Sequence, residues 1–170
     1  MLLTPEQIRD RVRELGEEIT ETYRQSEPVM VVVMQGAIIF FADLVREIKL
    51  PTISDAICVS SYLKGTTASQ EPQLLLPPQH DWRDRDVIFV EAIVDTGKTA
   101  ALLSALSRDR MARTARLCAL LDKPSRRVRD VVPDYVGFTI PDLFVVGYGL
   151  DYKGQYRNLP GIDTLTVEAT

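Results

Sequence analysis

The stretch from residue 87 to residue 100 has the residue types and the spacing that favour binding of a phosphate group. A buried apolar run at 87–90 is followed by Glu91 and Asp95, and then by Thr96-Gly97-Lys98-Thr99, where a helix is expected to begin. Backbone N–H groups and the helix dipole attract an anion at such a point, and Gly97 lets the backbone approach it closely. The threonine hydroxyls add donors, and the two carboxylates would face the remainder of the ligand. The pattern therefore indicates a phosphate monoester carried on a sugar.

A nucleotide-binding P-loop is an alternative for the same segment. Gly97-Lys98-Thr99 is the tail of that motif, and Ala92 stands where its first glycine would be. Asp122, at the end of the apolar run 117–121, could then bind magnesium. Ile93, Val94 and the acidic Asp95 argue against a loop that must wrap a diphosphate with its backbone. Local chemistry thus favours the sugar phosphate but leaves open both the P-loop and a strand-turn-helix without a ligand.

Buried strands are expected to hold this loop in place. Apolar runs predict strands at 29–34, 56–59, 87–90, 117–121, 135–138 and 144–148. The polar segment from 60 to 80 is a long connection, typical of a functional lid or a hairpin excursion. In a parallel sheet, ligands bind beyond the carboxyl ends of the strands.

Helices are expected between these strands, which makes the fold class α/β with a mostly parallel central sheet. Thr4 should cap the first helix, with Pro5 at its first position and Gln7 closing a capping box. Its buried stripe is expected to consist of Ile8, Val12, Leu15 and Ile19. Two further helices are expected at 38–48 and at about 99–108. One side of the 38–48 helix is expected to carry Phe41, Leu44, Val45 and Ile48.

Length and composition limit the class of protein. The 170 residues suit one domain, and a net charge of −4 disfavours a general nucleic-acid binder. No apolar run approaches the roughly 20 residues of a membrane span, and no secretory signal is recognisable. Cys58 and Cys118 lie in apolar runs, which favours free thiols in a reducing cytoplasm and leaves a disulfide between them open. With His80 as the single histidine, a histidine metal site or a catalytic triad is not expected.

The segment from Glu91 to Thr99 also resembles the phosphoribosyl-pyrophosphate signature of type I phosphoribosyltransferases, in the hypoxanthine-guanine branch. Further segments match that family in the same order, so the resemblance covers nearly the whole chain. They lie at 40–44, 60–62, 121–124, 134–138, 140–142, 144–152 and 156–160. The resemblance implies a Rossmann-like sheet with a small hood formed by the terminal segments. It also implies a single phosphoribosyltransferase domain at 1–170, with a flexible catalytic loop at about 60–80.

The activity that the resemblance implies is purine salvage: transfer of the 5-phosphoribosyl group to hypoxanthine and/or guanine, giving IMP or GMP and pyrophosphate. Asp95 would be the catalytic acid–base group at the purine N7. The implied phosphoribosyl site, including the 5′-phosphate cradle, is Glu91, Asp95, Thr96, Gly97, Lys98 and Thr99. The implied purine site is Lys123, Phe144, Val145 and Asp151. The implied pyrophosphate site is Gln35, Gly36 and Arg157.

The same resemblance implies a catalytic loop that begins with Ser61 and Tyr62, and Mg²⁺ held by Asp151 and Glu91. Small-molecule substrates, a homodimer or homotetramer, and a cytoplasmic location without nucleic-acid or membrane partners follow from it as well. Taken alone, Phe144 would be a core residue, and Lys123 and Arg157 would be solvated surface charges.

Three positions depart from the family pattern. Ala92 replaces the second of two adjacent acids, Gln35 replaces a lysine in the pyrophosphate loop, and Leu143 replaces a lysine before the stacking aromatic. Such losses leave a second hypothesis open, a catalytically weak ligand-sensing regulator built on the same fold.

Overall fold

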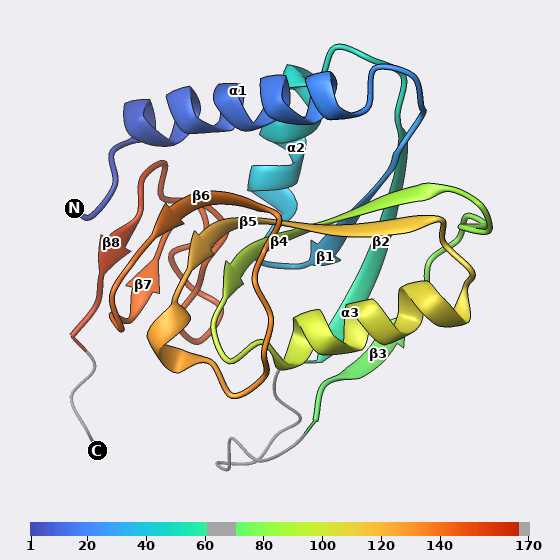
Figure 1. Ribbon diagram of the computed structural model, residues 1–170. Coiled ribbons are helices and arrows are strands. Elements are labelled where there is room, and N and C mark those ends of the chain that lie inside the picture. Colours follow the sequence, from blue (N-terminus) through green and yellow to red (C-terminus); the bar gives the residue numbers. More distant parts are fainter. Residues whose placement is uncertain (61–70, 167–170) are drawn as a thin grey trace.

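The computed structural model describes residues 1–60 and 71–166. Six strands form one sheet in the order β3-β2-β1-β4-β5-β6, and only the β2–β3 pairing is antiparallel (Figure 1). The strands are β1 (Val29–Met34), β2 (Ile53–Ser60), β3 (Gln73–Leu76), β4 (Asp86–Val94), β5 (Thr114–Asp122) and β6 (Tyr135–Thr139). The predicted α/β fold with a mostly parallel central sheet is confirmed.

Helices cover both faces of this sheet. Helices α1 (Pro5–Thr22) and α2 (Ile38–Glu47) lie on one face, and α3 (Lys98–Asp109) lies on the other (Figure 1). A short 3-10 helix, η1 (Pro124–Arg126), follows β5. The hydrophobic core is correspondingly divided into one cluster beneath α1 and α2 and a second cluster beneath α3.

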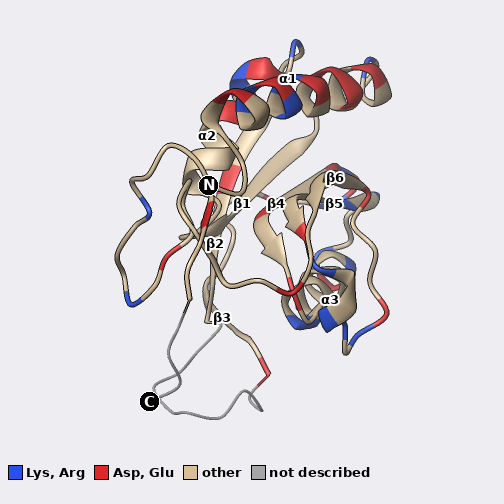
Figure 2. Ribbon diagram, turned by 90° about the vertical axis from the view of Figure 1, so that its left-hand side faces the viewer, with Lys and Arg blue, Asp and Glu red and all other residues tan. Residues whose placement is uncertain are grey.

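Helix α1 forms as its sequence predicts. The Thr4 hydroxyl accepts from the Gln7 backbone N–H at 3.3 Å, and the Gln7 side chain accepts from the Thr4 backbone N–H at 2.9 Å. Its buried face includes Ile8, Val12, Leu15 and Ile19. Figure 2 shows acidic and basic residues mixed along the helix, as a solvent-facing surface opposite an apolar stripe requires.

Several predicted element boundaries were wrong. β4 continues through Glu91 to Val94, because its last residues still pair with β5 up to Val94–Asp122. In the segment expected at 144–148, the strand is limited to Val145–Val146. Part of the 60–80 connection, Gln73–Leu76, is a strand on β2, so it contains a hairpin return. The predicted face of the 38–48 helix is confirmed: Leu44 and Ile48 are buried, Phe41 and Val45 are partly buried against the same core cluster, and Phe40 joins them.

A small two-stranded sheet forms the hood. β7 (Val145–Val146) pairs antiparallel with β8 (Asp163–Thr164), and Leu3 bridges Ile162. The N-terminal amine lies 3.0 Å from the Asp163 carboxylate. Both terminal segments thus meet at the same end of the sheet (Figure 1), as predicted.

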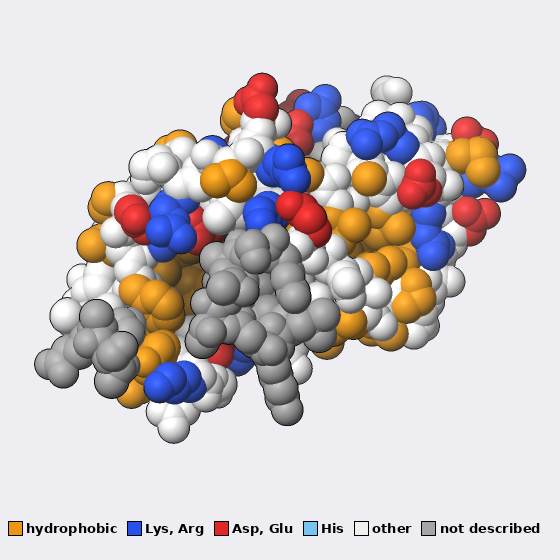
Figure 3. Space-filling view, turned by 90° about the horizontal axis from the view of Figure 1, so that it is seen from below, with side chains coloured by type: hydrophobic (Ala, Val, Ile, Leu, Met, Phe, Trp, Pro, Cys, Tyr) orange, Lys and Arg blue, Asp and Glu red, His pale blue; other side chains and the backbone are white. Residues whose placement is uncertain are grey.

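Surface features agree with the composition. On the face in Figure 3, acidic and basic side chains are interspersed with apolar ones. In residues 1–60 and 71–166, no helix is both long enough and apolar enough to cross a membrane. Cys58 and Cys118 are both free thiols, so the disulfide left open by the sequence is excluded.

Asp86, the first residue of β4, ties the amino ends of β4 and β5 together. Its carboxylate accepts from Arg113 Nε at 3.0 Å and from the Thr114 hydroxyl at 2.8 Å. The Arg113 hydrogen bond, aided by Thr114, outweighs burial and lowers the pKa of Asp86 to about 2. A depressed folded-state pKa contributes stability above the unfolded value, and that contribution is lost as pH falls through the folded value.

We therefore expect the wild-type melting temperature to fall steeply between about pH 4 and about pH 2, partly through Asp86. The variant Asp86→Asn should be less stable near neutrality and should lose less over that interval. Circular dichroism melts from neutral pH downward measure both effects. Asp10→Asn, at an exposed carboxylate on α1, is the control. Parallel melting-temperature curves for wild type and Asp86→Asn would contradict the assignment.

Candidate active site

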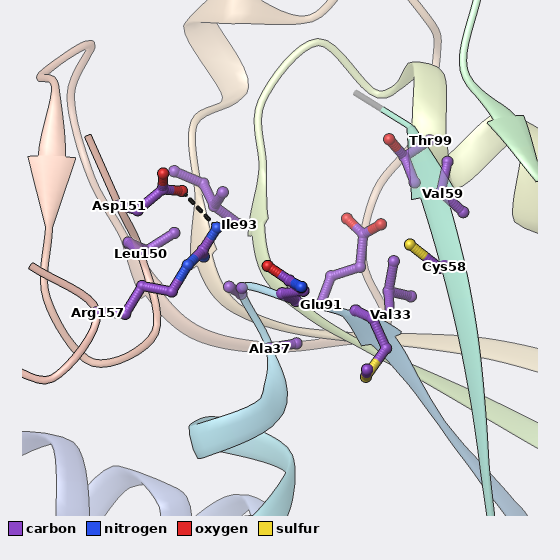
Figure 4. Close-up of a pocket in the computed structure, with 14 residues that line it drawn as sticks. Val33, Ala37, Cys58, Val59, Glu91, Ile93, Thr99, Leu150, Asp151 and Arg157 are labelled. Atoms are coloured by element: carbon purple, nitrogen blue, oxygen red, sulfur yellow. Dashed lines mark ion pairs between the residues drawn. The ribbon is translucent and has the colours of Figure 1, made fainter. Parts of the chain in front are cut away.

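A cavity of about 570 Å³ opens at the carboxyl ends of β1, β2 and β4, where a parallel sheet is expected to bind ligands. The strands contribute Val33, Cys58, Glu91 and Ala92, among other residues (Figure 4). Loops and helices add Gln35, Gly36, Thr99, Asp151 and Arg157. The cavity therefore brings together predicted phosphoribosyl, metal and pyrophosphate residues.

The predicted phosphate cradle lies where β4 passes into α3. Gly97 is the N-cap residue, with φ 82°, and the backbone N–H of Lys98, the first residue of α3, donates to the Thr96 hydroxyl at 3.5 Å. A side chain at this φ would be strained, and its Cβ would also lie 3.2 Å from the Arg129 carbonyl oxygen. Thr96 offers its carbonyl to the backbone N–H groups of Val128 and Arg129 at 3.0 and 3.2 Å. The segment that contains Val128 and Arg129 thus holds the loop in place at the N-terminus of α3.

This geometry disfavours the P-loop alternative. That motif needs its loop to begin at position 92, but β4 runs on to Val94. Only Asp95, Thr96 and Gly97 remain between β4 and α3. A three-residue turn fits a single phosphate rather than a wrapped diphosphate.

Glu91 is a buried acid in the cavity wall. Its residue exposure is 6%, and Figure 4 shows its carboxyl group on the side of the cavity that carries Cys58 and Thr99. Burial raises the pKa of Glu91 to about 8, and the Arg127 charge opposes that shift. The group is consequently more suited to hydrogen bonding with a hydroxyl-bearing ligand than to holding a cation by itself.

Asp95 stands just beyond the end of β4 and is engaged by an arginine that the sequence did not single out. Arg126 Nε donates to the Asp95 carboxylate at 3.0 Å, and Arg126 Nη1 to Asp142 at 3.4 Å. Both carboxylates are partly exposed. The arginine links the phosphate loop to the segment that precedes Phe144.

Lys123 is buried, contrary to its surface-charge interpretation. Its residue exposure is 6%, and its ammonium group donates to the Leu143 carbonyl and lies 3.9 Å from Asp142. Its backbone N–H donates to the Val94 carbonyl at 3.0 Å, so it sits directly beside the start of the phosphate loop. A buried cation next to that loop can donate to an oxygen of a neighbouring ligand.

Phe144 is exposed, so the core interpretation of this residue was wrong. It is 46% accessible and meets Tyr152 edge-on, with ring centroids 5.6 Å apart. Val145 follows it in the hood, buried in β7. An exposed ring in such a T-shaped pair still leaves at least one face for a planar ligand.

The remaining predicted residues meet at the opposite wall of the cavity. The Met34–Gln35 peptide is cis, and a side chain at Gly149 would collide with the Gly36 carbonyl, so the hood packs directly on this loop. Arg157 pairs with Asp151 at 2.8 Å, drawn as a dashed line in Figure 4. It also donates to the Gly149 carbonyl at 2.6 Å.

The predicted loop residues Ser61 and Tyr62 lie outside the described residues. The described chain resumes at Glu71, in the part of the 60–80 connection that leads into β3. Glu71 pairs with Arg129 at 2.9 Å and lies 3.7 Å from Lys98 Nζ. Sequence reasoning did not single out Arg126, Arg127 or Glu71, whose contacts border the predicted site. For the two arginines, the available signal was their position directly after Lys123-Pro124, beside a predicted site.

Two carboxylates that could bind Mg²⁺, those of Glu91 and Asp151, line the cavity. In the described part of the chain, no group of three or more His, Cys, Asp or Glu side chains could hold a metal. Asp151 does offer a partly exposed carboxylate in the cavity. Because Mg²⁺ typically takes one or two carboxylates plus substrate phosphate oxygens and water, this site fits the ion only together with a phosphorylated ligand.

Comparison with known proteins places the chain in a family. Residues 1–153 match the phosphoribosyl transferase domain. The chain is 42% identical over 165 residues to a hypoxanthine-guanine phosphoribosyltransferase of Bacillus subtilis, covering 97% of this chain and 92% of that protein. It is 43% identical over 169 residues to a hypoxanthine phosphoribosyltransferase of Salmonella typhimurium, covering 98% and 95%.

Solved structures agree with these sequence matches. A crystal structure of a hypoxanthine phosphoribosyltransferase from Staphylococcus aureus superimposes with a TM-score of 0.92 at 40% identity, covering 98% of this chain and 90% of that one. A hypoxanthine-guanine phosphoribosyltransferase from Bacillus anthracis gives 0.92 at 38% identity, covering 98% of both chains. The chain therefore belongs to the phosphoribosyl transferase domain family, in its hypoxanthine-guanine phosphoribosyltransferase branch.

Proposed function

We propose that this protein is a purine-salvage enzyme that transfers the 5-phosphoribosyl group of phosphoribosyl pyrophosphate to hypoxanthine and/or guanine. The observation that carries the proposal is the junction of β4 and β5. There, the phosphate loop that leads into α3 and the buried residue Lys123 are joined by the hydrogen bond from the Lys123 backbone N–H to the Val94 carbonyl. A nucleotide product joins a sugar phosphate to an oxopurine. Its binding site therefore needs an anion site close to a hydrogen-bond donor for the purine oxygen.

In the proposed reaction, the bond from ribose C1 to pyrophosphate breaks and a bond from C1 to a purine nitrogen forms, while the purine loses a proton. The residues Asp95, Thr96, Gly97, Lys98 and Thr99 would hold the 5′-phosphate end, and Glu91 would accept from a ribose hydroxyl. Asp95 would take the proton at N7. Lys123 would donate to the 6-oxo group, which favours an oxo over an amino purine.

Other residues would orient the two ends of the substrate pair. Phe144 would stack on the base and the Val145 backbone would bond to its edge. Gln35, Gly36 and Arg157 would bind the departing pyrophosphate. The loop that includes Ser61 and Tyr62 would exclude water from the reacting sugar, whose transition state has oxocarbenium character. When bound, Mg²⁺ held by Asp151, with Glu91 nearby, would neutralise pyrophosphate charge.

The direct test is to mix the protein with phosphoribosyl pyrophosphate, Mg²⁺ and hypoxanthine, guanine, xanthine or adenine, and to follow nucleotide formation. We expect nucleotide from oxopurines, none from adenine, and loss of product when Mg²⁺ is chelated. ATP hydrolysis is assayed alongside as the control for the P-loop alternative, in which the protein would hydrolyse a nucleoside triphosphate. Folded protein that is silent with every base would refute the proposal and leave ligand sensing as the alternative; no present observation favours that alternative.

Ala92 lies in the cavity wall where the family usually has a second acid. Because that carboxylate would accept from a ribose hydroxyl, Ala92→Asp is expected to lower the apparent KM for phosphoribosyl pyrophosphate roughly tenfold, with kcat little changed. Initial rates at saturating base measure this. Ala92→Asn, similar in size but uncharged, is the matched control. An unchanged or higher KM for the aspartate variant, in protein that melts like wild type, would contradict the expectation.

We further propose that residues 1–170 form one phosphoribosyltransferase domain with its catalytic loop at about 60–80, returning through β3. We also propose that the enzyme acts in the cytoplasm as a homodimer or homotetramer. Size-exclusion chromatography with light scattering tests the assembly, and a monomer at working concentration would refute it.

A further inference from the structure

Arg127 makes an unusually large set of contacts for an arginine outside any helix or strand. Nη1 donates to the carbonyls of Val94 at 2.7 Å and Lys123 at 3.2 Å, and also to the Asp95 carbonyl. Nε donates to the Val131 carbonyl at 3.1 Å, and Nη2 pairs with the Asp122 carboxylate. The Arg127 and Asp122 side chains are only 14% and 12% exposed. A planar guanidinium with five donors suits such a fork of acceptors, whereas a lysine ammonium does not.

These contacts lie just beyond the end of the β4–β5 pairing, between the predicted phosphate loop and the predicted base-binding segment. The β4–β5 ladder ends at the Val94–Asp122 pair. Beyond it, Asp95 leads into the phosphate loop and Lys123 leads toward the base-binding segment. Arg127 donates to the backbone carbonyls of both residues, so a single guanidinium fixes one relative to the other.

The opposite end of the same two strands carries another arginine–aspartate pair, whose arginine side chain is 56% exposed and which does not line the cavity. Arg113 binds the buried carboxylate of Asp86 through Nε at 3.0 Å, joining the amino ends of β4 and β5. Each pair therefore secures one end of the same strand pairing, but only Arg127 contacts backbone atoms of predicted site residues. Arg113 thus offers an internal control for the stability contribution of such a pair.

We propose that Arg127 is a positioning residue that sets the spacing between Asp95 and Lys123, and hence the alignment of the purine with the ribose. This inference rests on the proposed function. The guanidinium contacts Asp95 and Lys123 through their backbone carbonyls and not through their side chains. Its loss should let the phosphate loop and the base-binding strand end shift relative to each other while each still binds its own part of the substrates.

The test compares Arg127→Lys and Arg127→Gln with Arg113→Lys and Arg113→Gln in steady-state assays. Misalignment by about 1 Å can cost about a hundredfold in rate, so kcat is expected to fall at least tenfold in both Arg127 variants. The KM values for base and phosphoribosyl pyrophosphate should change by less than about threefold, because each half-site persists. Both Arg113 variants should keep wild-type kcat even where their melting temperatures fall.

Arg127→Lys retains the charge beside Asp122, so it keeps the inference testable if the glutamine variant fails to fold. Wild-type kcat in folded Arg127→Lys would overturn the inference, since charge alone would then suffice. An equal loss of kcat in the Arg113 variants would also overturn it, by making the effect one of stability. Inactive wild-type protein would instead refute the proposed function itself, and this inference with it.

Discussion

Replacing Asp95 with asparagine is expected to lower kcat about a hundredfold or more while leaving the KM for the base within about threefold of wild type. Asparagine keeps the size and hydrogen-bonding reach of the side chain, but its amide cannot accept the purine proton. Asp95 directly follows β4 and borders the phosphate loop, so its backbone position should survive the change. Steady-state rates with hypoxanthine and guanine, together with a melting curve, measure the effect.

The ion pair with Arg126 complicates this experiment, because Asp95→Asn also weakens that contact. Arg126→Gln is the matched control, since it removes the ion pair and retains the carboxylate. We expect Arg126→Gln to keep kcat within about threefold of wild type. A near-normal rate for Asp95→Asn would remove Asp95 as the acid–base group. An equal loss in Arg126→Gln would transfer the effect to the ion pair.

Replacing Lys123 with methionine is expected to lower kcat/KM for oxopurines by about ten- to a hundredfold, the value of a hydrogen bond from a charged donor. Methionine preserves the apolar length of the side chain in its buried position. The advantage of hypoxanthine over adenine should also narrow, because the ammonium group favours an oxygen acceptor and opposes an amino group. Competition assays with both bases measure this ratio.

Lys49→Met, at an exposed lysine just after α2, controls for loss of positive charge. It should leave both the rate and the base preference unchanged. If Lys123→Met retained the wild-type discrimination between hypoxanthine and adenine, Lys123 would not be the group that contacts the 6-position. A loss of rate with an unchanged base ratio would likewise exclude Lys123 as the residue that selects the base.

Much of the scaffold followed from local sequence. The two partners of the Thr4–Gln7 capping box lie only three positions apart, so they are close in the chain whatever the tertiary fold. The continuous apolar run of β1 marked a strand covered on both faces, and all but its last residue are buried. The ends of elements were less predictable, because β4 extends to Val94 only through pairing with β5.

Family membership was likewise readable from the sequence. Several segments matched in order, and both the relatives and the solved structures agree with that resemblance. The roles assigned to individual residues remain predictions, although the cavity brings Glu91, Gly36, Asp151 and Arg157 together. Segments that match a family in the same order along the chain identify the fold and its loops. They do not measure what each side chain does.

Only the tertiary structure decided the environment of the charged residues. Arg126 and Arg127 are neighbours of the same type, yet Arg126 is half exposed beside Asp95 while Arg127 is nearly enclosed by two strand ends. The partners of Arg127 at Val94 and Asp95 lie 33 and 32 positions away. Lys123 is buried and Phe144 exposed, against the ordinary preference of each residue type. Burial, charge pairing and pKa depend on which distant segments converge, and that convergence arises only when the sheet is assembled.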